Sequence, residues 1–144
     1  MLRNTNLYEI TKMTKARLKR KDLVYPDLCY KIIGILFDIW TKVGPGHKEK
    51  FYQNAVAQGF RLANIDFKEQ LPAKLCYKNK IIGVYYFDFL IENKIVLEIK
   101  VREYFSRKDI KQLYSYLKAK NLKLGLMAHF TGTGVKYKRI VNLK

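Results

Sequence analysis

The sequence predicts an α/β fold in which a mixed β-sheet is flanked by helices, in the order helix, helix, three strands, helix, strand. Two early segments repeat apolar residues at the spacing of an amphipathic helix. Three later segments, separated by short turns, are rich in β-branched and aromatic residues, which is typical of strands joined as hairpins. A third helical segment and an apolar strand follow, and this succession is typical of an α/β sandwich.

The first helix is predicted to begin at Asp27, a candidate N-cap, and its apolar stripe runs through residues 28–39. The sequence Gly-Pro-Gly at residues 44–46 ends it, because glycine and proline both interrupt a helix. A second helix is expected over residues 47–65, with an apolar face that includes Phe60.

Residues 66–78, 81–91 and 95–101 are the three predicted strands. Pro72 lies inside the first of them, and a proline cannot donate a ladder hydrogen bond. The first strand is therefore expected at the edge of the sheet or next to a bulge.

The third helix is predicted to start at Ser106, because Asp109 follows three residues later in an arrangement that resembles a capping box. The apolar segment 122–130 is a buried strand, and residues 135–142 form either an edge strand or a short terminal element.

The 144 residues suffice for one domain, expected over residues 23–144, and 49% of them are hydrophobic, as in folded proteins. Residues 1–22 are polar and basic and are interpreted as an N-terminal arm. This arm could lie along a phosphate backbone or could be a solvated tail without a partner.

The charge balance indicates a polyanionic partner, most plausibly nucleic acid, because 29 Lys and Arg face only 12 acidic residues, a net charge of +17. A compositional bias without a binding role would produce the same excess. The residues expected to contact nucleic acid are basic ones, in the arm and in the domain: Lys19, Arg20, Lys21, Lys48, Arg102, Arg107 and Lys108.

Several classes of protein are disfavoured by the sequence. Cys29 and Cys76 form no CxxC pair, and only His47 and His129 could join them as zinc ligands, so neither a disulfide framework nor a structural zinc site is expected. No apolar stretch reaches membrane-spanning length and the N-terminus has no apolar signal core. We expect a cytoplasmic protein that does not associate with membranes.

The segment IVLEIK, residues 95–100, places Glu98 and Lys100 on one face of an apolar strand, because residues two apart point the same way. A turn centred on Asn93 would put Asp88 opposite Glu98, with Cβ atoms about 4.5–5.5 Å apart. A register shift of one residue would move Asp88 to the other face.

Two carboxylates at that distance repel each other unless a cation lies between them. A hard divalent ion such as Mg²⁺ or Mn²⁺ suits this position, because such ions bind carboxylate oxygens and substrate phosphates. Lys100 could orient or deprotonate an attacking water or stabilise charge on the phosphate. The alternative is a structural salt bridge between Lys100 and either Glu98 or Asp88.

Three further polar residues fit the same chemistry. Gln112 and Tyr116 lie four apart on one helical face and could hold a water or a phosphate oxygen, or could simply be a half-exposed helix surface. Glu49 is either an acid at a helix N-terminus, favoured there by the helix dipole, or another metal ligand acting directly or through water.

These residues, in this order, resemble a known family. Gly46, Glu49 and Tyr52 match the pattern of the GxxExxY protein family, and residues 121–130 are similar to text that recurs in that family before the last strand. Residues 85–100 and 112–116 resemble motifs of the PD-(D/E)XK nuclease superfamily, to which that family is assigned. The resemblance covers about residues 23 to 143. One departure is Phe87, which stands where the superfamily motif has proline.

The resemblance implies a restriction-endonuclease-like core and Mg²⁺-dependent (or Mn²⁺-dependent) hydrolysis of phosphodiester bonds in nucleic acid, with DNA the expected substrate in repair or defence. It also implies roles for six residues: Glu49, Asp88 and Glu98 as metal-binding acids, Lys100 as the catalytic lysine, and Gln112 and Tyr116 as supporting groups. Two alternatives stay open, a non-catalytic nucleic-acid-binding module and a nuclease-fold subunit of a larger complex. A homodimer or a protein partner is also left open.

Overall fold

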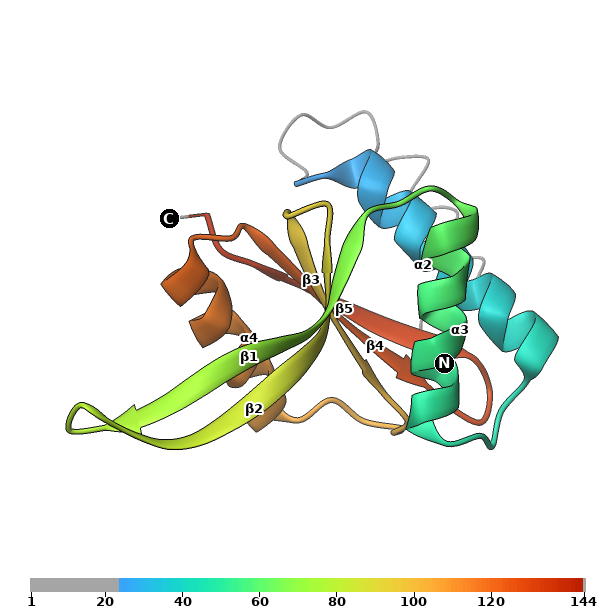
Figure 1. Cartoon of the computed structure of the whole chain (residues 1–144). Helices are drawn as coiled ribbons and strands as arrows, with labels where there is room; N and C mark the ends of the chain where they lie inside the picture. The colour runs from blue at the N-terminus through green and yellow to red at the C-terminus, as the bar shows by residue number, and fades with distance from the viewer. Residues whose placement is uncertain (1–23, 144) are drawn as a thin grey trace.

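The computed structural model describes residues 24–143, which form a five-stranded mixed sheet with helices on both faces (Figure 1). The predicted N-terminal arm, including Lys19, Arg20 and Lys21, lies outside the described residues. The helices are α2 (Pro26–Val43), α3 (Glu49–Leu62) and α4 (Arg107–Lys120), and the strands are β1 (Phe67–Tyr77), β2 (Lys80–Ile91), β3 (Ile95–Lys100), β4 (Leu124–Phe130) and β5 (Val135–Val141).

The strands lie in the order β1-β2-β3-β4-β5. Only β3 and β4 are parallel, and α4 is the crossover between them, as parallel neighbours require. The predicted α/β class and element order are confirmed. β1 is an edge strand, as Pro72 indicated, and β5 shows that the C-terminal segment is an edge strand too.

The two faces of the sheet are covered by different helices. One cluster of buried side chains, including Phe60 of α3 and Phe89 of β2, joins α2 and α3 to the sheet. A second cluster, including Leu113 of α4 and Val96 of β3, joins α4 to the opposite face. The sheet is therefore the middle of three layers, and no helix within residues 24–143 is long and apolar enough to cross a membrane.

The starts of two helices test the capping predictions. Ser106 caps α4, since its Oγ accepts a hydrogen bond of 3.0 Å from the backbone N–H of Asp109. The prediction of Asp27 as N-cap is wrong, because Tyr25 occupies that position and Asp27 lies within the first turn of α2. Pro26 explains the shift: its fixed φ already suits the first helical residue.

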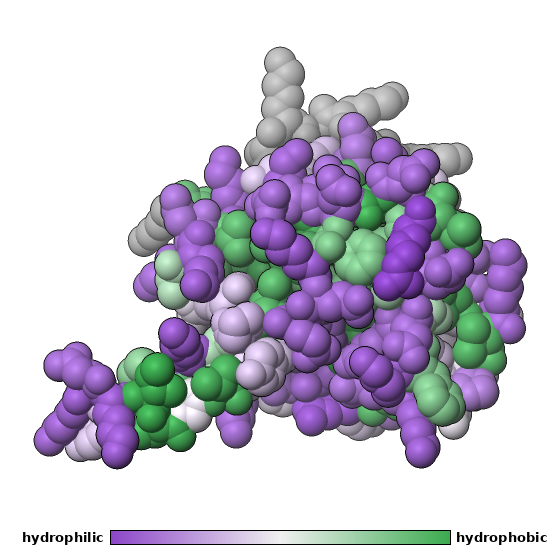
Figure 2. Space-filling model, viewed as in Figure 1, coloured by the Kyte–Doolittle hydropathy of each residue, from purple (hydrophilic) through white to green (hydrophobic). Residues whose placement is uncertain are grey.

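The β1–β2 hairpin extends well beyond the body of the molecule (Figure 1). We call residues 71–87 the hairpin arm. Figure 2 shows apolar side chains gathered on it, and the exposed large ones are Leu75, Tyr77, Ile81, Ile82, Val84 and Tyr86. Its charged residues are all lysines: Lys74, Lys78 and Lys80. The arm therefore combines exposed apolar surface with positive charge alone.

Candidate active site

The pairing of β2 with β3 has the register predicted from a turn centred on Asn93. Phe89 pairs with Leu97 and Ile91 with Ile95. The regular ladder ends at Phe89 and Leu97, so that the two strands separate at the next position, which is occupied by Asp88 on one side and Glu98 on the other.

Carboxylate oxygens replace the backbone hydrogen bonds at this separation. The backbone N–H of Ile99 donates to Oδ2 of Asp88 at 2.7 Å, and the N–H of Asp88 donates to Oε1 of Glu98 at 3.2 Å. Both acids are thereby fixed to the backbone of the neighbouring strand, and their side chains lie together in the gap between the strands.

Asp88 is only 7% exposed, and its other oxygen also has a partner. Oδ1 accepts a hydrogen bond of 2.9 Å from Nε2 of Gln53, which lies on α3. Burial raises the pKa of Asp88, the Ile99 hydrogen bond opposes this, and the charge of Glu49 adds to the increase. The carboxylate of Asp88 is thus well ordered but unfavourable to ionise.

Glu98 is in a still less favourable environment. Burial and then the nearby charge of Asp88 raise its pKa to about 8. The Lys100 ammonium opposes this shift but its Nζ lies 3.8 Å from Oε2 of Glu98, a long separation for an ion pair. The Lys100 ammonium therefore does not compensate for the burial of the Glu98 carboxyl beside Asp88.

His129 of β4 lies beside Lys100 of β3. From the sequence it was a candidate only for a zinc site, which is not expected. It is opposite Lys100 in the parallel register, fully buried, and stacked on Phe105 with ring centroids 4.1 Å apart. Within residues 24–143 neither ring nitrogen has a hydrogen-bond partner, and burial, followed by the charge of Lys100, lowers the pKa of His129 to about 4. A lone imidazole in the apolar segment 124–130 was the signal available in the sequence.

The turn before α3 is fixed by the other residues of the first motif. Gly46 has φ 88°, a conformation that favours glycine. Tyr52 is buried, stacks on Phe130 at 4.3 Å between centroids, and donates a hydrogen bond from its hydroxyl to the carbonyl of Gly44. The chain therefore enters α3 in a defined direction.

Glu49 is the first residue of α3 and is exposed, with Lys48 as the N-cap. Gln53 follows one turn later on the same helical face, which explains why both residues act on Asp88. Sequence reasoning missed Gln53, although its spacing of four from Glu49 was the available signal.

Gln112 and Tyr116 lie on α4, on the side of the sheet where the open groove is. Both line an open groove between α4 and the hairpin arm, and the Tyr116 ring lies 4.9 Å from the ring of Phe87, the residue before Asp88. Within residues 24–143, no hydrogen bond or ion pair joins them to Asp88, Glu98 or Lys100. Their role at the acids stays a prediction.

Four of the basic residues named from the sequence, Lys48, Arg102, Arg107 and Lys108, lie within the described residues, at different places on the surface. Lys48 is exposed at the start of α3 and Arg102 forms an ion pair of 2.9 Å with Asp109. Arg107 and Lys108 line the groove beside α4. Only this last pair lies with other basic side chains around one cavity.

Comparison with known families decides what kind of protein has this arrangement. A family model described as the PD-(D/E)XK nuclease superfamily matches residues 26–140. The chain belongs to this superfamily. The closer resemblance to the GxxExxY family stays a prediction, and Phe87 in place of proline is compatible with membership.

Solved structures also resemble this PD-(D/E)XK protein. The crystal structure of SSO0001 matches with a TM-score of 0.50 and 15% identity, covering 96% of this chain and 79% of that one. An alkaline exonuclease (LHK-Exo) from Laribacter hongkongensis has a TM-score of 0.45 and 13% identity, covering 83% and 71%. No curated protein matches the sequence significantly. The first likeness supports the restriction-endonuclease-like fold.

The donor set of this PD-(D/E)XK protein suits a hard divalent cation. In residues 24–143 no three His, Cys, Asp or Glu side chains form a group that could hold a metal ion, so Glu49 does not join Asp88 and Glu98 in one cluster. Mg²⁺ needs only one or two carboxylates when water and substrate phosphates complete its shell. Asp88 and Glu98, which are buried together and unfavourable to ionise without a cation beside them, fit that requirement.

Proposed function

We propose that this protein is a Mg²⁺-dependent nuclease that hydrolyses phosphodiester bonds in nucleic acid, with DNA as its substrate. The observation that supports the proposal best is the meeting of Asp88, Glu98 and Lys100 where β2 and β3 separate, in a member of a nuclease superfamily.

Asp88 and Glu98 would hold the Mg²⁺ or Mn²⁺, with Glu49 contributing through water. Bound there, the metal would polarise the scissile phosphate and lower the pKa of a coordinated water. Gln53 and the backbone N–H of Ile99 hold the Asp88 carboxylate in one orientation through its two oxygens. This fixed geometry reduces the reorganisation that binding requires.

Lys100 would act on the reacting groups. Its ammonium lies beside Glu98 and is mostly buried, with 18% of the side chain exposed. A cation in this position can orient the attacking water or stabilise the negative charge that develops on the phosphate. The buried, neutral imidazole of His129 on the neighbouring strand adds no competing positive charge near neutral pH.

The test is cleavage of single-stranded, duplex and branched DNA, and of RNA, with Mg²⁺ or Mn²⁺. Asp88→Asn and Lys100→Met should each reduce the cleavage rate by roughly 10²-fold or more, as expected for groups that act in the transition state. Nucleic-acid affinity should change little. Asp38→Asn and Lys42→Met are matched controls, because these residues form an exposed ion pair on α2, and they should cleave like the wild type.

A second candidate function is nucleic-acid binding without catalysis, alone or as a subunit of a larger complex. It is favoured by the absence of a three-residue metal group in the described part of the chain and by the net charge of +17. A metal titration separates the two. A pure binding module should show no Mg²⁺ affinity that Glu98→Gln removes, whereas the nuclease should lose that affinity in the variant.

A further inference from the structure

The groove between α4 and the hairpin arm has a volume of about 1050 Å³ and is open to solvent along its length. Its walls come from two elements far apart in the sequence, residues 72–75 and Tyr85 of the arm and residues 107–120 of α4. It is distinct from the gap between β2 and β3, since neither Asp88 nor Glu98 lines it.

All charged side chains that line this groove are basic. They come from both walls, and they are Lys74, Arg107, Lys108, Lys111 and Lys120. Among residues 24–143 no acidic side chain lines the groove. The groove therefore presents a concave positive surface, and a polyanion is the ligand that matches it.

Aromatic side chains form the inner wall. The rings of Tyr85 and Phe87 lie edge to face with centroids 5.6 Å apart, and Phe87 lies 4.9 Å from Tyr116. Tyr85 and Tyr116 are partly exposed to the groove, while Phe87 is buried beneath them. Partly exposed aromatic rings beside cations are the combination on which bases of a single strand stack.

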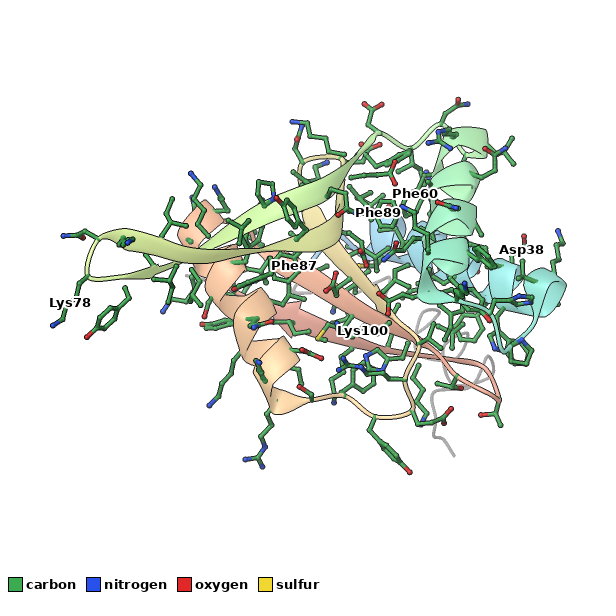
Figure 3. The ribbon with its side chains drawn as sticks, turned by 60° about the horizontal axis from the view of Figure 1, so that its bottom comes forward. Asp38, Phe60, Lys78, Phe87, Phe89 and Lys100 are labelled. Atoms are coloured by element: carbon green, nitrogen blue, oxygen red, sulfur yellow. The ribbon has the colours of Figure 1, made fainter. Side chains whose placement is uncertain are left out.

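The aromatic row connects the groove with the candidate active site. Phe87 is followed directly by Asp88, and Figure 3 shows Phe87 on the side of the hairpin that faces α4, whereas Phe89 lies with Phe60 beside α3. The aromatic row therefore ends one residue before Asp88, whose Oδ1 accepts a hydrogen bond from Gln53 of α3 on the other face of the sheet.

We propose that this groove binds a single strand of nucleic acid, with its bases against Tyr85 and Tyr116 and its phosphates against the basic side chains. The proposal rests on the proposed nuclease function and names the form of the substrate. A duplex fits less well, because its base faces are already stacked inside the helix and only phosphates remain for contact. A second copy of this strongly basic chain would bring like charges together.

The test measures equilibrium binding of a fluorescent 12-nucleotide single strand and of the matching duplex in EDTA, so that no cleavage occurs. The wild type should bind the single strand at least tenfold more tightly. Tyr85→Ala should weaken single-strand binding roughly 5- to 150-fold, since one stacking contact is lost. Tyr85→Phe should bind like the wild type. Tyr30→Ala is the control, because Tyr30 is 51% exposed on α2, on the other face of the sheet.

A photocrosslinking experiment locates the bound strand on the wild-type protein, without any amino-acid substitution. A single strand containing bromouracil should crosslink to peptides that contain Tyr85 or residues 107–120. Crosslinks confined to α2, equal affinity for strand and duplex, or unchanged affinity of Tyr85→Ala would each overturn the proposal. Because binding is measured without metal, a failure of the groove proposal says nothing about cleavage, which is tested separately. Conversely, a protein that binds the single strand in the groove but does not cleave it would contradict the proposed nuclease function and not the groove proposal.

Discussion

At the scale of single residues, the acids between β2 and β3 are held where they are hard to ionise. Asp88 and Glu98 are both mostly buried, and burial is the largest cause that raises the pKa of each; the charge of Asp88 raises the pKa of Glu98 further. The hydrogen bonds from Gln53 and Ile99 keep Asp88 in place against this repulsion. Such an arrangement is unfavourable for the folded protein alone and becomes favourable when a cation binds.

Glu98→Gln should therefore stabilise the metal-free protein near neutral and alkaline pH. The pKa of Glu98 is about 8 in the folded state against 4.5 ordinarily, so the folded protein holds a proton that the unfolded chain has lost between these values. Wild-type stability should consequently fall as pH rises from about 4.5 to about 8. The variant lacks this loss, and its free energy of unfolding at pH 8 should exceed that of the wild type by about 4 kcal/mol.

The measurement is urea unfolding in EDTA at pH 4, 6 and 8. The difference in free energy of unfolding between the variant and the wild type should be near zero at pH 4 and should increase as the pH rises. The imidazole of His129 titrates in both proteins, so its effect cancels in this difference. Glu69→Gln is the control, because Glu69 is exposed and should show no such growth. An equal or lower stability of Glu98→Gln at pH 8 would contradict the burial argument.

At the scale of elements, the approach of α4 to the sheet depends on Gly125 of β4. A Cβ atom at this position would lie 2.8 Å from Cδ2 and 2.9 Å from Cγ of Leu113, a fully buried residue of α4. The glycine therefore permits the close contact that places Tyr116 next to Phe87. The position of the groove follows from this contact.

Gly125→Ala should destabilise the protein by about 1–3 kcal/mol, the usual cost of overpacking a buried site. Gly83→Ala is a matched control in β2, because a Cβ there meets nothing within 4 Å, and its effect should stay within about 0.5 kcal/mol. Chemical denaturation measures both. A neutral result for Gly125→Ala would mean that Leu113 moves freely and that α4 is not held by this contact.

The sequence could predict features that depend on neighbouring residues in the chain. The cap at Ser106 and the register set by the turn at Asn93 are of this kind, and both are confirmed. Regular strand alternation would put Phe87 and Phe89 on one face, but Phe87 packs with α4 and Phe89 with α3. The pairing of β1 with β2 is interrupted at this point, where Gln70 has φ 58°, and a distortion of this kind has no clear local signal.

In the candidate site, too, some features follow from neighbouring residues in the chain and others depend on tertiary packing. Glu98 and Lys100 share a strand face through simple alternation, and Asp88 follows from the hairpin register. The hydrogen bond from Gln53 to Asp88 depends instead on where α3 packs against the sheet, across 35 residues of sequence. The placement of Gln112 and Tyr116 along the groove beside α4 likewise depends on tertiary packing, which neither spacing nor composition specifies.

At the scale of the whole molecule, the two faces of the sheet differ in the basic side chains that their helices carry. The face covered by α4 holds the five basic side chains of the groove, and the arm above it bears only lysines as charged groups. The opposite face is covered by α2 and α3, where Asp38 pairs with Lys42. A nucleic-acid strand is therefore expected on the α4 face.

The salt dependence of single-strand binding should reflect this distribution. Each phosphate contact contributes about −0.7 to the slope of log K against log salt, so five contacts predict a slope of roughly −3.5 and about a 10²-fold loss of affinity between 50 and 200 mM salt. A nuclease and a non-catalytic binding module should show the same salt dependence. The experiment therefore tests where the strand binds and not whether it is cleaved. Lys111→Ala should make the slope less steep by about 0.7, whereas Lys31→Ala, an exposed lysine on α2, should leave it unchanged. The reverse result would place the phosphates on the α2 face, because counterions are released only where the strand lies.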